Sequence, residues 1–421
     1  MTRMKESGID WIGQIPEEWE VAKVNHIFEE HKQKNRGNKE KNLLSLSYGR
    51  IIRKSIDSSF GLLPESFDTY NIIQRGDIVL RLTDLQNDKR SLRVGLAREN
   101  GIITSAYLTL RLKNLESNDS YMYYLLHTYD ICKVFYNFGG GVRQGGTWSD
   151  IYKMELLIPP KNEQQKIADF LDKKTAQLDK VKALLEEQIQ KLKDYRASLI
   201  YETVTKGLDK TVPMKDSGID WIGQVPQGWE MVKFKYFFNT SKGLSITKEC
   251  LVDEGIPVIN YGQIHSSMSK QVQSCDVRLP FVPDYYLSKK GANLNQGDFV
   301  FADTSEDLEG AGNFSTRIDS TGPLLAGYHT IIARLNNYDE YDFRYFMHLF
   351  DSLAIRKQIQ NKVSGIKVYS ITQGILNSIF VIIPPKSEQQ KIANLLDEKT
   401  AQIDKLVQIK NQQIENINKQ R

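Results

Sequence analysis

The chain of 421 residues carries an internal repeat, and this repeat constrains its fold more than any other feature. Residues 5–23 and 215–233 are identical at thirteen of nineteen positions, at an offset of 210. Residues 158–180 and 383–405 are identical at eighteen of twenty-three positions, at an offset of 225. Two blocks repeated in the same order predict two copies of one fold within a single chain.

The segments between the shared blocks differ far more than the blocks do. Only a few similar positions remain, such as Arg75–Val79 (RGDIV) and Gln296–Val300 (QGDFV). Tyr107 and Tyr328 fall at the same offset of 221. The second segment is 15 residues longer, the difference between the offsets of 210 and 225. The pattern therefore predicts one frame that carries two different surfaces.

Each repeated IPP block predicts the start of a long helix. Pro159-Pro160 and Pro384-Pro385 end the preceding strands, because proline lacks an N–H group. Asn162 with Gln165, and Ser387 with Gln390, have the spacing of an N-cap residue and its partner three positions later. The first helix is expected to end at Lys206, before Gly207.

Both helices carry apolar stripes with heptad spacing, which favour packing against another helix. The packing positions are Leu171, Leu178, Leu185, Leu192 and Leu199 in the first helix, and Leu396, Ile403 and Ile414 in the second. An antiparallel coiled coil within the chain is the preferred arrangement. The alternative is that each helix pairs with a partner chain. A helix of about 44 residues would span roughly 65 Å.

The two variable segments are expected to be mixed α and β. Tyr107–Leu112 alternates as a half-buried strand does. Asp119–Tyr136 and Asp342–Ile359 have helical apolar spacing, and a glycine-containing loop and a short apolar strand follow each.

Those loops supply the leading candidates for DNA contact. The first contains Arg143, Gln144 and Thr147, and the second contains Lys367 and Tyr369. Arginine and glutamine can bond to base edges, and glycine allows the backbone to approach a ligand closely. Further basic candidates for phosphate contact are Arg53, Lys54, Arg81, Arg90 and Lys242, and Arg93 belongs to the same clusters. Plain surface charge is the alternative for each of them.

Composition excludes several classes of function. The net charge of +4 permits a nucleic-acid partner only through local clustering of basic residues. The three cysteines have no metal-ligand spacing and fit a reducing, cytoplasmic setting, and no membrane span or secretory signal is expected. No adenine-methyltransferase motif and no GxxxxGK[ST] phosphate loop is present, so no cofactor or metal is expected on this chain. Asp77 and Asp298 each follow a glycine and suit a turn.

The DWIGxxPxxWE block, the IPPKxEQQKIAxxLD helix start and the duplicated variable segments resemble the specificity subunit of Type I restriction-modification systems. The resemblance implies a non-catalytic subunit with two target-recognition domains in a pseudo-twofold α+β arrangement, separated by the antiparallel helices. Its expected divisions are recognition domain 1 (1–157), central helix (158–207), recognition domain 2 (208–382) and C-terminal helix (383–421).

The resemblance also implies a set of partners. Double-stranded DNA would be bound at a bipartite target, with the helices fixing the unread gap. Two modification subunits would carry S-adenosylmethionine and methylate adenine, and ATP- and Mg-dependent restriction subunits would cut unmodified DNA. The alternative is a duplicated coiled-coil adaptor that binds only protein. Arg421 aligns with Arg196, so nothing in the second copy corresponds to Ala197–Lys206; either the natural protein stops short there or the chain has been truncated.

Overall fold

The computed structural model describes residues 3–54, 66–85, 88, 91–114, 116–137, 145–266, 270–363, 365 and 368–420. The chain separates into two compact units, Met1–Val181 and Lys182–Gln420. Helix α4, Lys161–Lys206, therefore contributes residues to both units. We call the part of unit 1 that precedes α4 domain 1, and the part of unit 2 between α4 and helix α9 (Lys386–Gln420) domain 2.

Domain 1 is built on a four-stranded antiparallel sheet in the order β4-β11-β8-β9. These strands are β4 (Phe28–Glu30), β11 (Leu108–Leu112), β8 (Ile78–Leu80) and β9 (Val94–Leu96). Smaller antiparallel pairs surround this sheet: β1 (Met4–Glu6) with β2 (Gln14–Pro16), β3 (Glu20–Lys23) with β12 (Glu155–Ile158), β5 (Leu44–Ser47) with β6 (Arg50–Arg53), and β7 (Asn71–Ile73) with β10 (Gly101–Ile103). The helices are α1 (Val24–Ile27), α2 (Asp119–Ile131), the 3-10 helix η1 (Val134–Asn137) and α3 (Trp148–Ile151).

Domain 2 repeats this sheet and extends it by one strand. Its strand order is β16-β24-β20-β22-β18, with β16 (Phe238–Lys242), β24 (Thr330–Leu335), β20 (Phe299–Ala302), β22 (Phe314–Arg317) and β18 (Gln271–Val272). The other strands are β13 (Met214–Asp216) with β14 (Gln224–Pro226), β15 (Glu230–Lys233) with β26 (Phe380–Ile383), β17 (Ile256–Ile259) between β19 (Phe281–Val282) and β23 (Leu325–Ala326), and β21 (Thr304–Ser305) with β25 (Tyr369–Ser370). The helices are α5 (Tyr261–His265), α6 (Phe343–Asp351), α7 (Leu353–Gln360), α8 (Gln373–Ser378) and the 3-10 helices η2 (Phe234–Tyr236), η3 (Lys248–Cys250), η4 (Asp284–Ser288) and η5 (Lys290–Ala292).

Both long helices begin two residues earlier in the sequence than the predicted capping residues imply. The carbonyl of Pro160 accepts the N–H groups of Glu163 and Gln164, and the carbonyl of Pro385 does the same in α9. The prolines therefore occupy the N-cap position, and the prediction of Asn162 and Ser387 as caps is wrong. Proline fits here because its missing N–H would have no helical partner. The predicted end of α4 at Lys206 is confirmed, with Gly207 at a φ of +70°.

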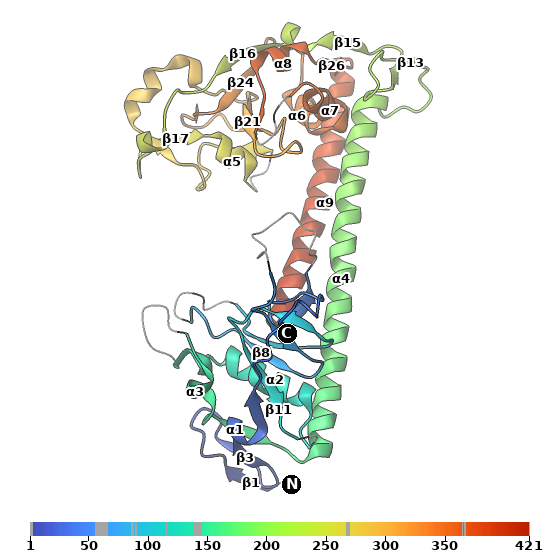
Figure 1. Cartoon of the computed structure of the whole chain (residues 1–421). Helices are drawn as coiled ribbons and strands as arrows, with labels where there is room; N and C mark the ends of the chain where they lie inside the picture. Colours follow the sequence, from blue (N-terminus) through green and yellow to red (C-terminus); the bar gives the residue numbers. More distant parts are fainter. Residues whose placement is uncertain are drawn as a thin grey trace. The chain divides into compact units, whose positions relative to one another are not determined.

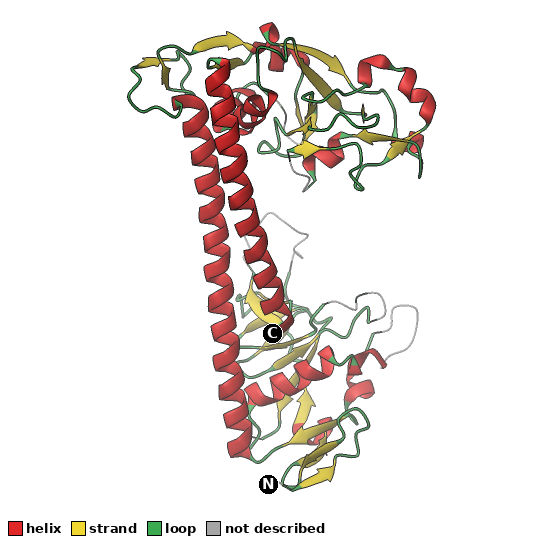
Figure 2. Cartoon of the chain, turned by 180° about the vertical axis from the view of Figure 1, so that it is seen from behind, coloured by secondary structure: helices red, strands yellow, loops and turns green. Residues whose placement is uncertain are grey.

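Within unit 2 the helices α4 and α9 pair antiparallel. Arg196 contacts Asp404 at 3.5 Å, and Lys410 donates to Gln188 at 2.6 Å. Residue numbers therefore rise along α9 in the direction in which they fall along α4. Both views show these helices side by side (Figures 1 and 2). Of the predicted packing residues, Leu396 and Ile403 are buried, and Leu171, Leu178, Leu185, Leu192, Leu199 and Ile414 are half-buried. Pairing within the chain is therefore confirmed for this part of α4.

The predicted domain helices are shorter than their apolar spacing suggested. In domain 1, α2 ends at Ile131, and Lys133 has a φ of +62° before η1 begins. In domain 2, Ser352 adopts an extended conformation (φ −74°, ψ 153°) that separates α6 from α7. The predicted strand at Tyr107–Leu112 is confirmed as β11, but it is not half-buried, because Thr109 on its polar face is also only 1% exposed.

A buried ion pair occupies the same place in both sheets. Asp77 precedes β8 and binds Arg111 of β11, with both hydrogen bonds at 2.7 Å. Asp298 precedes β20 and binds Arg334 of β24, the shortest contact being 2.6 Å. Each carboxylate also accepts a backbone N–H from three residues earlier, so the predicted turn is confirmed. A buried carboxylate is tolerated because these donors replace its lost hydration.

The shared N-terminal block is fastened to its helix in the same way in both units. The indole Nε1 of Trp19 donates to Glu163, and that of Trp229 donates to Glu388, both at 2.9 Å. Trp229 is buried, whereas Trp19 is half-buried. The other two repeated tryptophans, Trp11 and Trp221, are 44% and 41% exposed. The repeated sequence is therefore a structural frame that joins each domain to a helix start.

Candidate nucleic-acid interface

The glycine-containing segments predicted to contact DNA end at equivalent places in the two sheets. In domain 1 the N–H of Gly146 donates to the carbonyl of Leu82, just after β8, at 2.7 Å. In domain 2 the N–H of Ile371 donates to the carbonyl of Asp303, just after β20, also at 2.7 Å. The two bonds join residues at the offsets of the repeat, 225 and 221. Each domain thus brings the segment after its central strand next to the segment before its last short helix.

Four of the predicted DNA contacts, Arg90, Arg143, Gln144 and Lys367, lie outside the described residues. Their assignment stays a prediction from the sequence.

Thr147 is described, and it forms the N-cap of α3. Its N–H and its hydroxyl both donate to Asp150, at 2.6 Å and 2.7 Å. These bonds hold the pKa of the Asp150 carboxyl below its usual value, because they stabilise the charged form. Thr147 is exposed beside the Leu82 segment, so it stays a candidate for DNA contact while it fixes the direction of α3.

Arg93 has a different role from the surface charge or phosphate contact considered in the sequence. Its side chain is fully buried and donates to the carbonyls of Arg81, Thr83, Asp84 and Asp88. One guanidinium therefore holds together the described residues that follow β8, 81–85 and 88, since its fixed fork of donors suits several carbonyls at once. Arg81, the first of these residues, is half-buried and lies 3.9 Å from Asp88. Arg81 and Thr147 are thus brought onto adjoining segments.

The remaining basic candidates of domain 1 lie at the end of β6. Arg53 binds Glu99 through its Nε at 2.8 Å, and this bond lowers the pKa of Glu99 and raises that of Arg53. Lys54 is exposed, and its N–H donates to Leu43. Arg53 already has a carboxylate partner, so a phosphate would have to compete for it. Lys54 has the more accessible charge of the two.

Domain 2 has a polar cavity of about 700 Å³ at the position of its glycine-containing segment. It is lined by Tyr261, Gly262, His265, Thr304, Ser305, Glu306, Asp307, Glu309, Gly310, Asn313 and Val368. Strand β21 lines the cavity, and its pairing with β25 places the predicted Tyr369 opposite Ser305. Tyr369 is half-buried, and Lys242 is exposed at the end of β16.

The cavity offers acceptors and donors suited to base edges rather than phosphates. Three of its lining residues, Glu306, Asp307 and Glu309, are acidic, and a carboxylate repels phosphate but accepts from the amino group of cytosine. His265 is fixed by a contact of its Nε2 with the carbonyl of Thr304 at 2.7 Å and of its Nδ1 with Asn313 at 3.1 Å. Polar groups held in this way can discriminate one base edge from another.

The cavity was not predicted from the sequence, because the candidates for DNA contact were sought among basic residues. The signal was present in the segment 303–313 (DTSEDLEGAGN), where small, acidic and amide residues alternate after a strand. In the described part of the chain, no three His, Cys, Asp or Glu residues lie close enough to hold a metal ion. None of the helices described is both long and apolar enough for a membrane span.

The chain is similar to two curated proteins of Methanocaldococcus jannaschii over most of its length. It is 23% identical to the Type I restriction enzyme MjaVIII specificity subunit, over 96% of this chain and 90% of that one. It is 24% identical to the putative type I restriction enzyme MjaX specificity subunit, over 97% and 92%.

A solved structure shows the same fold. That chain comes from a study of complex assembly and conformational transition in the type I R-M system. The TM-score is 0.67 at 16% identity, with 96% of each chain covered.

The family model for the Type I restriction modification DNA specificity domain matches residues 16–193 and again residues 226–419. The two matches correspond to the two halves of the internal repeat. The chain therefore belongs to the Type I restriction modification DNA specificity family, with two copies of its domain.

Proposed function

We propose that this chain is the DNA-specificity subunit of a Type I restriction-modification enzyme, in which domain 1 and domain 2 each read one half of a bipartite target. The chain binds and positions DNA in this proposal, and other subunits perform the methylation and cleavage. Membership of the specificity family supports this assignment.

One observation carries the proposal. The frame is repeated down to single hydrogen bonds, yet the segments joined by the Gly146–Leu82 and Ile371–Asp303 bonds differ in sequence and in shape. In domain 1 the buried Arg93 donates to the carbonyls of Thr83 and Asp84 there, and domain 2 has the β21–β25 pair and an acidic cavity. A constant frame with different surfaces at equivalent places suits the reading of two different base sequences.

Recruitment of two modification subunits belongs to the same proposal. The paired helices of unit 2 leave apolar side chains in solvent: Leu184 is 48% exposed, Tyr195 57%, Leu406 46% and Ile409 46%. Apolar side chains gathered on an exposed helix surface are a feature of protein-binding sites, which supports this part of the proposal. S-adenosylmethionine, ATP and Mg²⁺ would bind to the modification and restriction subunits, and the complex would act in the cytoplasm.

The helices would also set the gap between the two half-sites. A helix has a fixed rise per residue, so its length converts directly into distance. Adding or removing whole turns in the paired region of α4 and α9 should change the preferred gap and leave the bases of each half-site unchanged. A change in the half-sites instead would contradict this part of the proposal.

Methylation mapping of the host genome tests the proposal. Deletion of this chain should abolish N6-methyladenine at one two-part motif, and its return should restore the same motif. Binding of the purified subunit complex to a duplex with that motif should weaken steeply with salt, because phosphate contacts release counterions. If no motif is lost on deletion and binding shows no salt dependence, the chain is a protein-binding adaptor instead.

A further inference from the structure

Each domain is joined to a long helix by a cluster of charged side chains, and the helix residues of the two clusters correspond. Asp172, Thr175 and Asp179 of α4 match Asp397, Thr400 and Asp404 of α9 at the offset of 225. A cavity lies at each cluster, of about 300 Å³ in unit 1 and about 370 Å³ in unit 2. We call these clusters joint 1 and joint 2.

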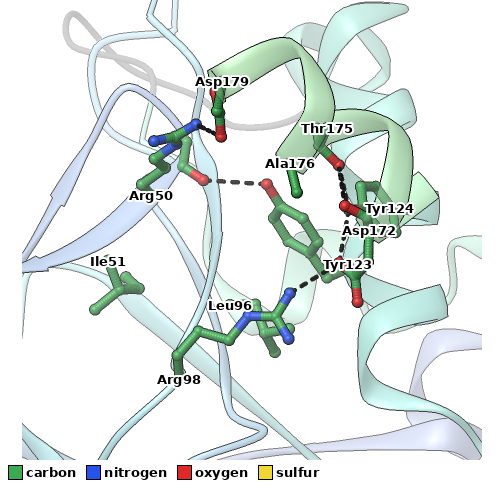
Figure 3. A pocket seen from close by; sticks show the side chains of 11 residues that line it. Arg50, Ile51, Leu96, Arg98, Tyr123, Tyr124, Asp172, Thr175, Ala176 and Asp179 are labelled. Atoms are coloured by element: carbon green, nitrogen blue, oxygen red, sulfur yellow. Dashed lines mark hydrogen bonds and ion pairs between the residues drawn. The ribbon is translucent and has the colours of Figure 1, made fainter. Parts of the chain in front are cut away.

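In joint 1 the cations come from the domain and the carboxylates from the helix (Figure 3). Arg50 binds Asp179 at 2.5 Å, and Arg98 binds Asp172 at 3.1 Å. The hydroxyl of Tyr124 donates to Asp172 at 2.8 Å. Two separated arginines thus connect the domain to helix positions two turns apart.

In joint 2 the charges are partly reversed, because a carboxylate comes from the domain and a cation from helix α4. Arg196 of α4 binds Asp351, at the end of α6, at 2.9 Å, and Lys270 approaches the same carboxylate at 3.5 Å. Arg196 also lies 3.5 Å from Asp404 of α9, so one guanidinium joins both helices to domain 2. About one turn before Asp351 on α6, His348 contacts Asp397 of α9 at 2.7 Å.

Asp351 is the centre of joint 2. Its side chain is only 12% exposed. Burial alone would raise its pKa, but the charges of Lys270 and Arg196 outweigh this effect and hold the pKa below the ordinary value. The carboxylate therefore stays charged and tied to partners on two sides.

The attachment of domain 2 does not rest on these charges alone. Its apolar core continues into both helices, because Ile200 and Val204 of α4 and Ile392 and Leu396 of α9 belong to one buried cluster with the domain. Apolar contacts give affinity without direction, whereas ion pairs and hydrogen bonds fix orientation. The apolar contacts therefore hold the domain on the helices, and the ion pairs and hydrogen bonds align it.

We propose that joint 1 and joint 2 fix the orientation of each domain on its helix, and that Arg196 and Asp351 are therefore positioning residues for the gap between the two half-sites. This inference rests on the proposed function. Neither residue reads a base, so their loss should relax the accepted gap and leave the recognised bases unchanged.

The test uses the full chain, co-purified with its modification subunits, and duplexes with the mapped half-sites and gaps that differ by one base pair. Asp351→Asn keeps the shape of the side chain and removes its charge. The ratio of methylation rates at the preferred gap and at a gap one base pair longer should fall roughly tenfold, which corresponds to about 1.4 kcal/mol. Arg50→Met should act in the same direction through joint 1.

Arg278→Met is the matched control, because Arg278 binds Asp276 within domain 2 and contacts neither helix. It should leave the ratio unchanged. Melting of each variant separates orientation from folding. If Asp351→Asn and Arg50→Met keep the wild-type ratio, or lower the rates equally at every gap, the inference is overturned. If the wild-type complex has no preferred gap and no two-part motif, the proposed function itself fails.

Discussion

Domain 1 and domain 2 share their frame and differ in the surfaces that the frame presents. Both have the buried aspartate–arginine pair across the central strands and the tryptophan–glutamate bond to the helix start. The two domains differ in the segments that directly follow β8 and β20: in one, carbonyls of the described residues bond to a buried arginine, and in the other a short strand pair lies beside an acidic cavity. The comparison shows that a repeated hydrogen-bond framework can support surfaces with different chemistry.

Substitution of the frame tryptophans should have the largest effect on stability, and it tests whether the frame is equivalent in the two units. Trp229→Ala should destabilise unit 2 by about 3–5 kcal/mol, because a fully buried indole is lost. Trp19→Ala should cost about half as much, since Trp19 is only half-buried. Chemical denaturation measures both. Equal losses would mean that burial does not distinguish the two sites.

The phenylalanine variants sharpen the same comparison. Trp19→Phe and Trp229→Phe each remove a 2.9 Å hydrogen bond to a glutamate while they keep an aromatic ring. Both should cost about 1.5 kcal/mol, the lower end for a hydrogen bond to a charged group, and less than the alanine variant at the same site. A large difference between the two would show that the repeated bond has different roles in the two units.

The buried ion pairs should have the next largest effect on folding. Asp298→Asn leaves Arg334 without its carboxylate and should lower the free energy of unfolding of unit 2 by about 2–3 kcal/mol, since Arg334 is partly exposed. Asp77→Asn should have a similar effect in unit 1. Denaturation midpoints of the two variants check the equivalence, and a neutral result at either position would contradict it.

The cavity of domain 2 should affect only recognition. Glu306→Gln replaces an acceptor with an amide and should change discrimination at one base by about 1–2 kcal/mol, because readout depends on donor and acceptor patterns. Methylation of duplexes with single base changes measures this effect. The change should appear in one half-site only. A uniform loss across all sequences would remove the cavity from base reading.

The pH dependence of stability at low pH is the smallest expected difference between the two units. In domain 2, burial of Asp319 opposes ionisation, but hydrogen bonds from Ser274, Thr321 and Arg317 lower its pKa to about 2. A lowered pKa contributes stability that is present above about pH 4 and lost as the pH falls toward 2. The contribution is about 1 kcal/mol after solvent screening.

The strand register places Glu99 of domain 1 at the position of Asp319, and a hydrogen bond from the exposed Arg53, rather than hydroxyl groups, is the main cause that lowers the pKa of Glu99. Asp319→Asn should therefore remove part of the acid sensitivity of unit 2 and leave unit 1 unchanged, as measured by unfolding midpoints between pH 5 and 2. An unchanged acid profile in the variant would contradict the role of Asp319.

The frame could be predicted from the sequence because its residues are repeated close together, as in the IPP blocks and the tryptophan blocks. The partners of Asp77 and Asp298 could not be predicted, since they depend on sheet register across 34 and 36 residues. The helix break at Ser352 was hidden because apolar spacing continues through it. The cavity at 304–313 was missed because Tyr261 and His265 of α5 become neighbours of this segment only in the folded chain.

The central claim is that each domain reads its own half-site from a shared frame. It is tested most directly by replacing the variable segment of domain 2, between β15 and β26, with that of domain 1, between β3 and β12, followed by methylation mapping. The account predicts a new motif in which the half-site of domain 1 occurs twice and that of domain 2 is absent. A motif that keeps the half-site of domain 2 would contradict it.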